Sequence, residues 1–190
     1  MPARPLRADA LRNRDLLIEV ATRAFTRDGE DATFEAIAKE AGLGIGTLYR
    51  HFPTREALVE AVYRGELAGL SASAEQLLAA SGPETGLREW MGRFVDFMTT
   101  KRGMADVLRA VINSGGNPYE QSRERALEAV AMLLDAGAAA GTIRADVDPL
   151  DVLTTLNGFS LAAVEPGQTD RLIDLLMDGL LARRATTDRP

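Results

Sequence analysis

Four neighbouring side chains near position 50 carry groups that can bind nucleic acid. Within the segment 47–52 the sequence places Thr47, Tyr49, Arg50 and His51 almost side by side. An arginine can donate two hydrogen bonds to a guanine edge or bind a phosphate, and hydroxyl and imidazole groups can donate to phosphate oxygens. The chemistry that these residues predict is DNA binding.

Residues that could do bond-making chemistry are scarce in the rest of the chain. His51 is the only histidine, and cysteine is absent, which excludes disulfides, thiolate catalysis and cysteine-based zinc sites. The sequence contains neither an HExxH nor a G-x-S-x-G motif. The glycines at 42, 44 and 46 have the wrong spacing for a dinucleotide-binding loop and follow an expected helix, not a strand. We therefore expect no enzyme activity, no cofactor and no metal site.

The elements that must position the four side chains are two short helices joined by a glycine-rich turn. The first has Thr33 as its expected N-cap and Gly42 as its left-handed end, and Pro53 ends the second. The apolar residues of the first helix recur at i, i+3, i+4 and i+7: Phe34, Ile37, Ala38 and Ala41. This layout predicts a helix-turn-helix over residues 33–52, with Leu48 and Phe52 in the core.

A recognition helix in the major groove would give several of these residues defined roles. Gly44 and Gly46 would let the backbone approach DNA, and Ile45 could touch a thymine methyl group. Thr33 and Arg55 stand at expected helix N-termini, which attract phosphate. The alternative is a solvated polar helix beside a turn. The predicted DNA contacts are Thr33, Gly44, Ile45, Gly46, Thr47, Tyr49, Arg50, His51 and Arg55.

Charge and hydropathy restrict how such a protein could bind DNA. The 190 residues carry a net charge of −6, so contact with DNA must be local. The most basic segment is residues 1–14, which hold Arg4, Arg7, Arg12 and Arg14 against Asp9 alone. No apolar segment follows this start, as a signal peptide would need, and no apolar run reaches the length of a membrane span. We expect a cytoplasmic protein.

Helical periodicity continues through the chain, with no sustained period-two alternation, so we predict an all-α fold of about nine helices. The first helix, over residues 8–28, carries an apolar stripe from Leu11 to Phe25. A long helix begins after Thr54 and contains Gly65 and Gly69, for which we expect close helix packing. Further start signals occur at Asn117-Pro118-Glu120 and Asp148-Pro149-Asp151. The expected division is a DNA-binding domain (1–53), a connecting helix (54–80) and a C-terminal domain (81–190).

The segment ATFEAIAKEAGLGIGTLYRHFPTREALVEAVY resembles the N-terminal domain of TetR-family transcriptional regulators. The similarity covers roughly residues 10–63. Two positions depart from the common pattern: Gly44 stands where many relatives have Ser or Thr, and Arg55 stands where Lys is commoner. The resemblance implies a three-helix DNA-binding head and an all-α homodimer with two recognition helices on a palindromic operator. It also implies a C-terminal ligand pocket and a dimer interface made by the last two helices.

On this basis we expect a repressor that a small apolar or aromatic effector releases from double-stranded operator DNA. For the pocket we predict Trp90, Phe94, Phe97, Met98, Met104, Leu108, Met132 and Phe159, although core packing would explain each of them as well. For the dimer interface we predict Leu153, Leu156, Leu172, Leu176 and Leu180. Two alternatives remain: a regulator without an effector, and a helical ligand-binding protein without sequence-specific DNA binding.

Overall fold

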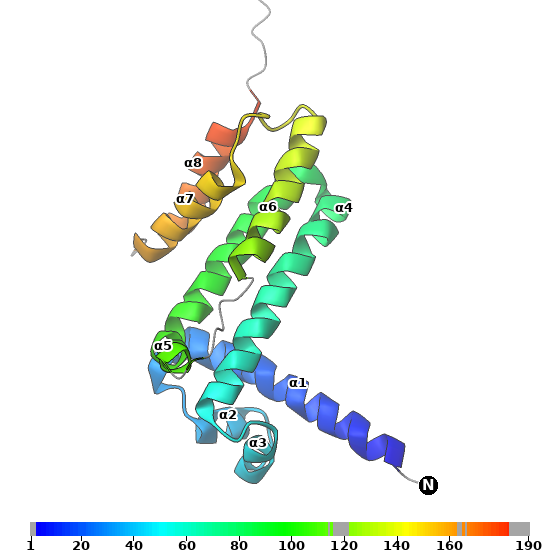
Figure 1. Cartoon of the computed structure of the whole chain (residues 1–190), viewed down its shortest axis with the longest axis vertical. Coiled ribbons are helices and arrows are strands. Elements are labelled where there is room, and N and C mark those ends of the chain that lie inside the picture. Colours follow the sequence, from blue (N-terminus) through cyan, green and yellow to red (C-terminus); the bar gives the residue numbers. More distant parts are fainter. Residues whose placement is uncertain (1–2, 114, 116–121, 163–164, 166, 183–190) are drawn as a thin grey trace, which may run out of the picture. The chain divides into compact units, whose positions relative to one another are not determined.

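The computed structural model describes residues 3–113, 115, 122–162, 165 and 167–182, with side chains from residue 8 onward. Over these residues the chain forms helices and no strand, which confirms the all-α prediction (Figure 1). The elements are α1 (Ala3–Asp28), the 3₁₀-helix η1 (Gly29–Asp31), α2 (Phe34–Glu40), α3 (Ile45–His51), α4 (Arg55–Gly103), α5 (Ala105–Asn113), α6 (Ser122–Ala139), α7 (Pro149–Ala162) and α8 (Gln168–Leu180).

Helix α4 consists of two arms. Gly82 interrupts it with a left-handed backbone (φ 75°), and Pro83 follows. The two arms lie side by side. A hydrogen bond joins them, in which the indole N–H of Trp90 donates to the carbonyl of Leu70 at 3.1 Å. With the two arms counted separately, the described residues contain nine α-helices.

The chain divides into two compact units. The first comprises residues 1–67 and 99–120, and the second comprises residues 68–98 and 121–190. The first unit therefore contains more than the helix-turn-helix: the start and the end of α4, and α5, pack with α1 to α3.

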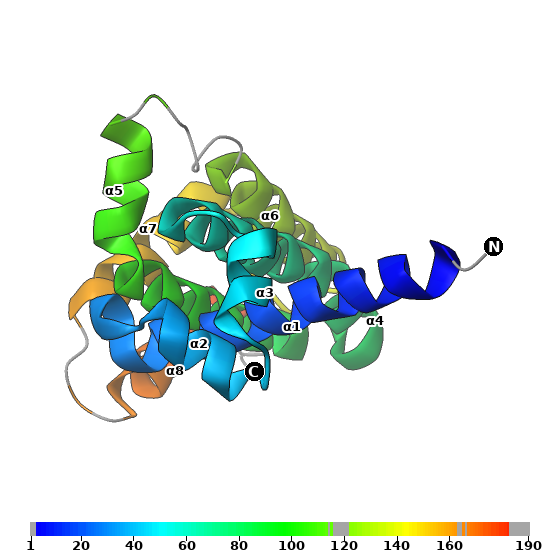
Figure 2. The ribbon, with the colours of Figure 1, turned by 90° about the horizontal axis from the view of Figure 1, so that it is seen from below.

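The first unit is built around α1. Its buried face begins at Leu17 and continues to Phe25, whereas Leu11 is 62% exposed. The expected apolar stripe is therefore wrong at Leu11, which precedes the packed part of the helix. Helices α2 and α3 lie beside α1, as Figure 2 shows. At the far end of α1, the Thr26 and Thr100 hydroxyls share a hydrogen bond of 2.8 Å.

Helix α5 belongs to the first unit and contacts η1. A hydrogen bond with the Asp106 carboxyl of α5, and the charge of that group, raise the pKa of the Glu30 carboxyl. The turn between α1 and α2 is thus in contact with a distant part of the sequence, since more than 70 residues separate Glu30 from Asp106.

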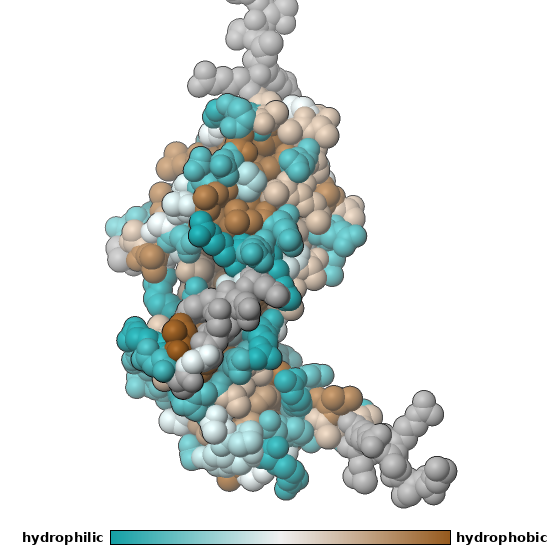
Figure 3. Space-filling view, viewed as in Figure 1, coloured by the Kyte–Doolittle hydropathy of each residue, from teal (hydrophilic) through white to brown (hydrophobic). Residues whose placement is uncertain are grey.

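The second unit has its core on the inner faces of the α4 arms, α6, α7 and α8. Trp90 and Leu87 are fully buried, and Ile143 packs directly against Gly137. Helix α7 begins as predicted, since Pro149 is its first residue and the Leu150 N–H donates to the Asp148 carboxylate at 2.8 Å. On the face drawn in Figure 3, hydrophilic side chains break the hydrophobic surface into small patches.

Two sequence expectations need comment. A side chain at Gly69 would meet nothing within 4 Å, and one at Gly65 would only reach Ile18 at 3.9 Å, so close helix packing does not explain these glycines. The start signal at Asn117-Pro118-Glu120 lies outside the described residues, as do the side chains of Arg4 and Arg7. No helix in the described part of the chain is long and apolar enough to cross a membrane.

Candidate nucleic-acid interface

The helix-turn-helix is closed by local hydrogen bonds. The Thr33 hydroxyl accepts from the Ala36 N–H at 3.2 Å, which caps α2 as predicted. After α2 the chain turns through Gly42, whose φ of +66° is costly for residues with a side chain. The Leu43 N–H then donates back to the Ala38 carbonyl at 2.9 Å. These bonds fix the direction in which the chain enters α3.

Buried residues on α3 hold the helix against α2 and α1. Leu48 is completely buried and Phe52, which ends the helix, is 2% exposed. On α2, Phe34 and Ile37 face the same core. The opposite side of α3 is open to solvent: Gly46 and Arg50 are exposed, Ile45 is 38% exposed and Tyr49 is 49% exposed. A row of exposed residues on a short, anchored helix is what major-groove recognition needs.

Tyr49 has two roles that the sequence could not separate. Its ring centroid lies 5.3 Å from that of Phe34, in a tilted arrangement that braces α3 against α2. Half of the residue nevertheless remains exposed. With Thr33, Glu35 and Arg55, these two rings line a hollow of about 300 Å³ beside the start of α2. Three of the predicted contacts, Thr33, Tyr49 and Arg55, are therefore neighbours in space.

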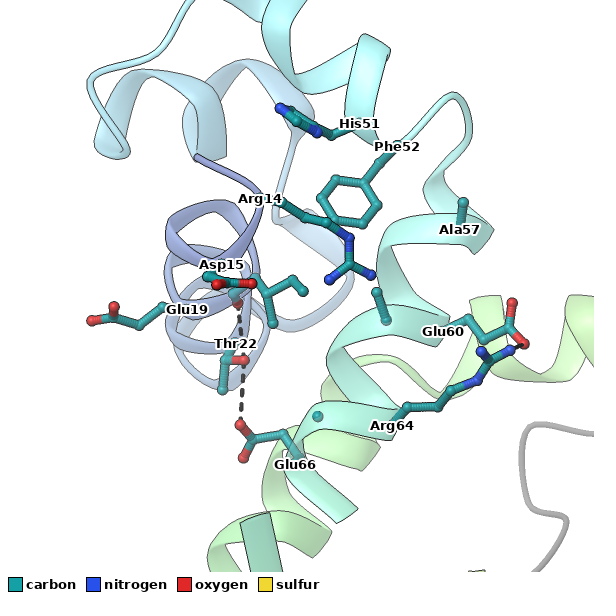
Figure 4. Close-up of a pocket in the computed structure, with 13 residues that line it drawn as sticks. Arg14, Asp15, Glu19, Thr22, His51, Phe52, Ala57, Glu60, Arg64 and Glu66 are labelled. Atoms are coloured by element: carbon teal, nitrogen blue, oxygen red, sulfur yellow. Dashed lines mark hydrogen bonds and ion pairs between the residues drawn. The ribbon is translucent and has the colours of Figure 1, made fainter. Parts of the chain in front are cut away.

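Three predicted contacts remain. Thr47 and His51 are residues of α3, and Gly44 precedes it. Thr47 and His51 are half-buried, and Gly44 is the exposed N-cap. His51 lines a second hollow, a groove of about 730 Å³ between α1 and the first turns of α4 (Figure 4). Both acidic and basic side chains line this groove, and Glu60 pairs with Arg64.

Sequence reasoning missed a contact between α1 and the end of α3. The Arg14 guanidinium lies 5.4 Å from the centroid of the Phe52 ring, and Figure 4 shows the two side chains together. In the sequence, Arg14 stands out only as part of the basic segment 1–14. No local signal could have found the pair, since 38 positions of the sequence separate its members.

Arg55 also differs from the expectation. Its guanidinium donates to the backbone carbonyls of Ala32 and Glu30, and it lies 5.3 Å over the Phe25 ring. The side chain that was expected at a phosphate is thus engaged inside the protein.

Gly44 is the N-cap of α3 and offers no side chain to cap it. Its backbone (φ −69°, ψ 143°) suits any residue, and a side chain would meet nothing within 4 Å. We expect Gly44→Ser to stabilise the protein by roughly a few tenths of a kcal/mol, because the hydroxyl can accept an N–H of the first turn. Thermal unfolding measures this. Gly42→Ser, at positive φ, is the opposing control and should destabilise. A lower melting temperature for Gly44→Ser would contradict the expectation.

The predicted pocket residues belong to both units. Trp90, Phe94 and Phe97 are buried in the second unit, with neighbouring ring centroids 5.6 and 6.4 Å apart. Met98 and Phe159 are half-buried in the same unit, and Met104 and Leu108 are buried in the first. Met132 is 43% exposed, unlike Trp90, Phe94 and Phe97. The buried face of α6 comprises Ala126, Ala129, Val130, Leu133, Leu134 and Gly137, and Met132 lies on the other side.

The predicted dimer residues differ in how far they are buried. Leu153, Leu156 and Leu180 are buried within the protomer, so they are not free to meet a partner. Leu172 and Leu176 are half-buried. The exposed leucines of these two helices are instead Leu150 (37%), Leu161 (66%) and Leu175 (67%).

Comparison with known proteins places this geometry in a family. The family model of the bacterial regulatory proteins of the tetR family matches residues 17–62, which contain α2 and α3. A second model, the C-terminal domain of SbtR-like transcriptional regulators, matches residues 82–182. The chain belongs to the TetR family. Its two matched segments together include the interface described above and most of the second unit.

Solved structures of other TetR-family members agree. The chain is 49% identical to the TetR transcriptional regulator SCO0520 from Streptomyces coelicolor, over 90% of this chain and 99% of that one, with a TM-score of 0.84. It is 34% identical to a TetR transcription regulatory protein from Mycobacterium vanbaalenii, over 93% and 99% of the two chains, with a TM-score of 0.74. A shorter match, 41% identical over 63 residues, joins it to an HTH-type transcriptional regulator of Staphylococcus aureus. That match spans 34% of the length of the curated relative.

Proposed function

We propose that this TetR-family chain is a transcriptional repressor that reads operator DNA with α3. The observation that carries the proposal is the exposed row of Ile45, Tyr49 and Arg50 on a helix held by buried Leu48. Arg50 supplies the group for bidentate reading of guanine or for a phosphate contact, and Tyr49 contacts the backbone. The chain's net charge is negative, so these local contacts must supply the specificity.

The proposal includes a homodimer, since two recognition helices must meet half-sites about 34–36 Å apart. The outward face of α8 supports it. There Leu175 is exposed and Leu172 half-buried, and with Gln168, Arg171, Asp174 and Asp178 they line a hollow of about 460 Å³. We place the partner on this face in place of the buried Leu153, Leu156 and Leu180.

An effector is the third part of the proposal. The cluster of Trp90, Phe94 and Phe97 in the second unit is apolar and aromatic, which favours an apolar or aromatic small molecule. Such a molecule would act through its different affinities for the DNA-binding and released states.

Arg50→Ala tests DNA reading. We expect the variant to lose roughly 5- to 150-fold in affinity for each operator half-site, because a lost base contact costs about 1–3 kcal/mol. The measurement is a gel shift at moderate salt against the duplex that wild-type protein selects from random-sequence DNA. Arg93→Ala, which removes the same charge from an exposed site in the second unit, is the matched control and should bind normally. If wild type prefers no sequence, repression by operator binding is wrong.

Leu175→Glu tests the dimer face. The variant places an unpaired charge at the partner contact, and burying such a charge is costly. We therefore expect the Kd of the dimer to rise at least about tenfold above that of wild type. Light scattering over a dilution series measures the change. Leu11→Glu, another exposed leucine on a different helix, should leave the oligomeric state unchanged. A monomeric wild-type protein would contradict this part of the proposal.

A further inference from the structure

Arg55, the first residue of α4, reaches back to the connection between α1 and α2. One guanidinium nitrogen donates to the Glu30 carbonyl at 3.0 Å, and the other donates to the Ala32 carbonyl. The guanidinium carbon also lies over the Phe25 ring, 5.3 Å from its centroid. The side chain is half-buried as a result. All four residues belong to the first unit.

The geometry is specific to arginine. Two acceptors two residues apart are met by two donors of one planar group, whereas the ammonium of lysine is a point charge without this fork. The cation–π contact with Phe25 adds to the difference, because arginine makes such contacts more often than lysine. In the connection itself, the Ala32 N–H donates to the Gly29 carbonyl only at the long distance of 3.4 Å. The Arg55 side chain adds two hydrogen bonds to this short turn.

The turn determines where α2 begins. Ala32 is 2% exposed and is followed directly by Thr33, the N-cap of α2. Phe34, the first residue of α2, packs its ring against Tyr49 on the recognition helix. A continuous set of contacts thus runs from Arg55 through the turn and α2 to the exposed face of α3.

We infer that Arg55 is a positioning residue for DNA reading and not a phosphate ligand. This inference rests on the proposed function, because it assigns a role within the same interface. Arg55 acts by holding the turn at Glu30–Ala32, which sets the start of α2 and the seat of Tyr49. Its guanidinium makes no contact with a DNA phosphate in the complex.

The salt dependence of DNA binding separates the two roles. Each phosphate contact contributes about 0.9 to the slope of log affinity against log salt, so a phosphate ligand lost from both heads would lower the slope by about 1.8. We expect Arg55→Met to weaken binding to the selected duplex at least tenfold while leaving this slope unchanged. Arg55→Lys keeps the charge and should still lose several-fold, because it lacks the fork.

Hydrogen exchange of the free protein gives a second readout. The amides of residues 32–36 should exchange faster in Arg55→Met and Arg55→Lys than in wild type, and at the wild-type rate in Arg50→Ala. Circular dichroism establishes that each variant is folded. The inference is overturned if Arg55→Met lowers the slope by about 1.8 and Arg55→Lys restores both slope and affinity. It is also overturned if Arg55→Met binds like wild type, or if these amides keep their protection.

Failure of the proposed function would look different. Wild-type protein would then show no preference for a selected duplex over a scrambled one. Hydrogen exchange would still decide whether Arg55 holds the turn, since that measurement needs no DNA.

Discussion

Replacing Gly103 by alanine is expected to destabilise the protein by about 3 kcal/mol, the upper part of the usual range for overpacked sites. An added methyl group would overlap the Phe25 carbonyl oxygen and stand 3.0 Å from its carbonyl carbon and 3.2 Å from the Gly29 Cα. These are backbone atoms at the end of α1, and they cannot move without disturbing the helix. The end of α4 would therefore have to separate from α1 within the first unit.

Denaturant unfolding followed by circular dichroism measures the effect, and the melting temperature should fall by roughly 10 °C. Gly69→Ala is the matched control, since it makes the same change in the same helix where nothing lies within 4 Å. There the expected change is a gain of about 0.5–1 kcal/mol from helix propensity. Equal effects of the two substitutions would show that α4 does not approach α1 so closely.

Trp90→Ala is expected to cost about 3–5 kcal/mol, because it removes a large and fully buried side chain. The indole N–H is already satisfied by the Leu70 carbonyl, and the ring packs beside Phe94. Trp90 thus joins the two arms of α4 within the second unit. We expect this loss whether or not an effector binds nearby.

Thermal and denaturant unfolding by circular dichroism suit this test, since the variant has lost the protein's only tryptophan. Trp90→Phe keeps a ring and loses the hydrogen bond, so it should cost less than the alanine variant. Arg93→Ala, at an exposed site three residues along the same arm, should change stability by less than about 0.5 kcal/mol. A small effect of Trp90→Ala would mean that the side chain lines an open cavity and not a packed core.

The local sequence determined the helix-turn-helix. Thr33 and Gly42 act through their own backbone and neighbours within a few residues, and each has the conformation that its residue type favours. Helical periodicity likewise identified Leu48 and Phe52 as core residues, because a short amphipathic helix has only one face to bury. The local sequence is therefore sufficient to recognise the family.

Tertiary structure alone decided how the ends of these helices are held. Arg55 turns inward because Glu30, Ala32 and Phe25 stand together in space, 23 to 30 positions earlier in the chain. Gly103 matters because α1 passes beside it. Periodicity also could not say which side of a leucine-rich helix faces its own core, so Leu153 and Leu156 were expected at a partner and Met132 in a pocket. A helix with apolar residues on several faces leaves that choice to the packing of the other helices.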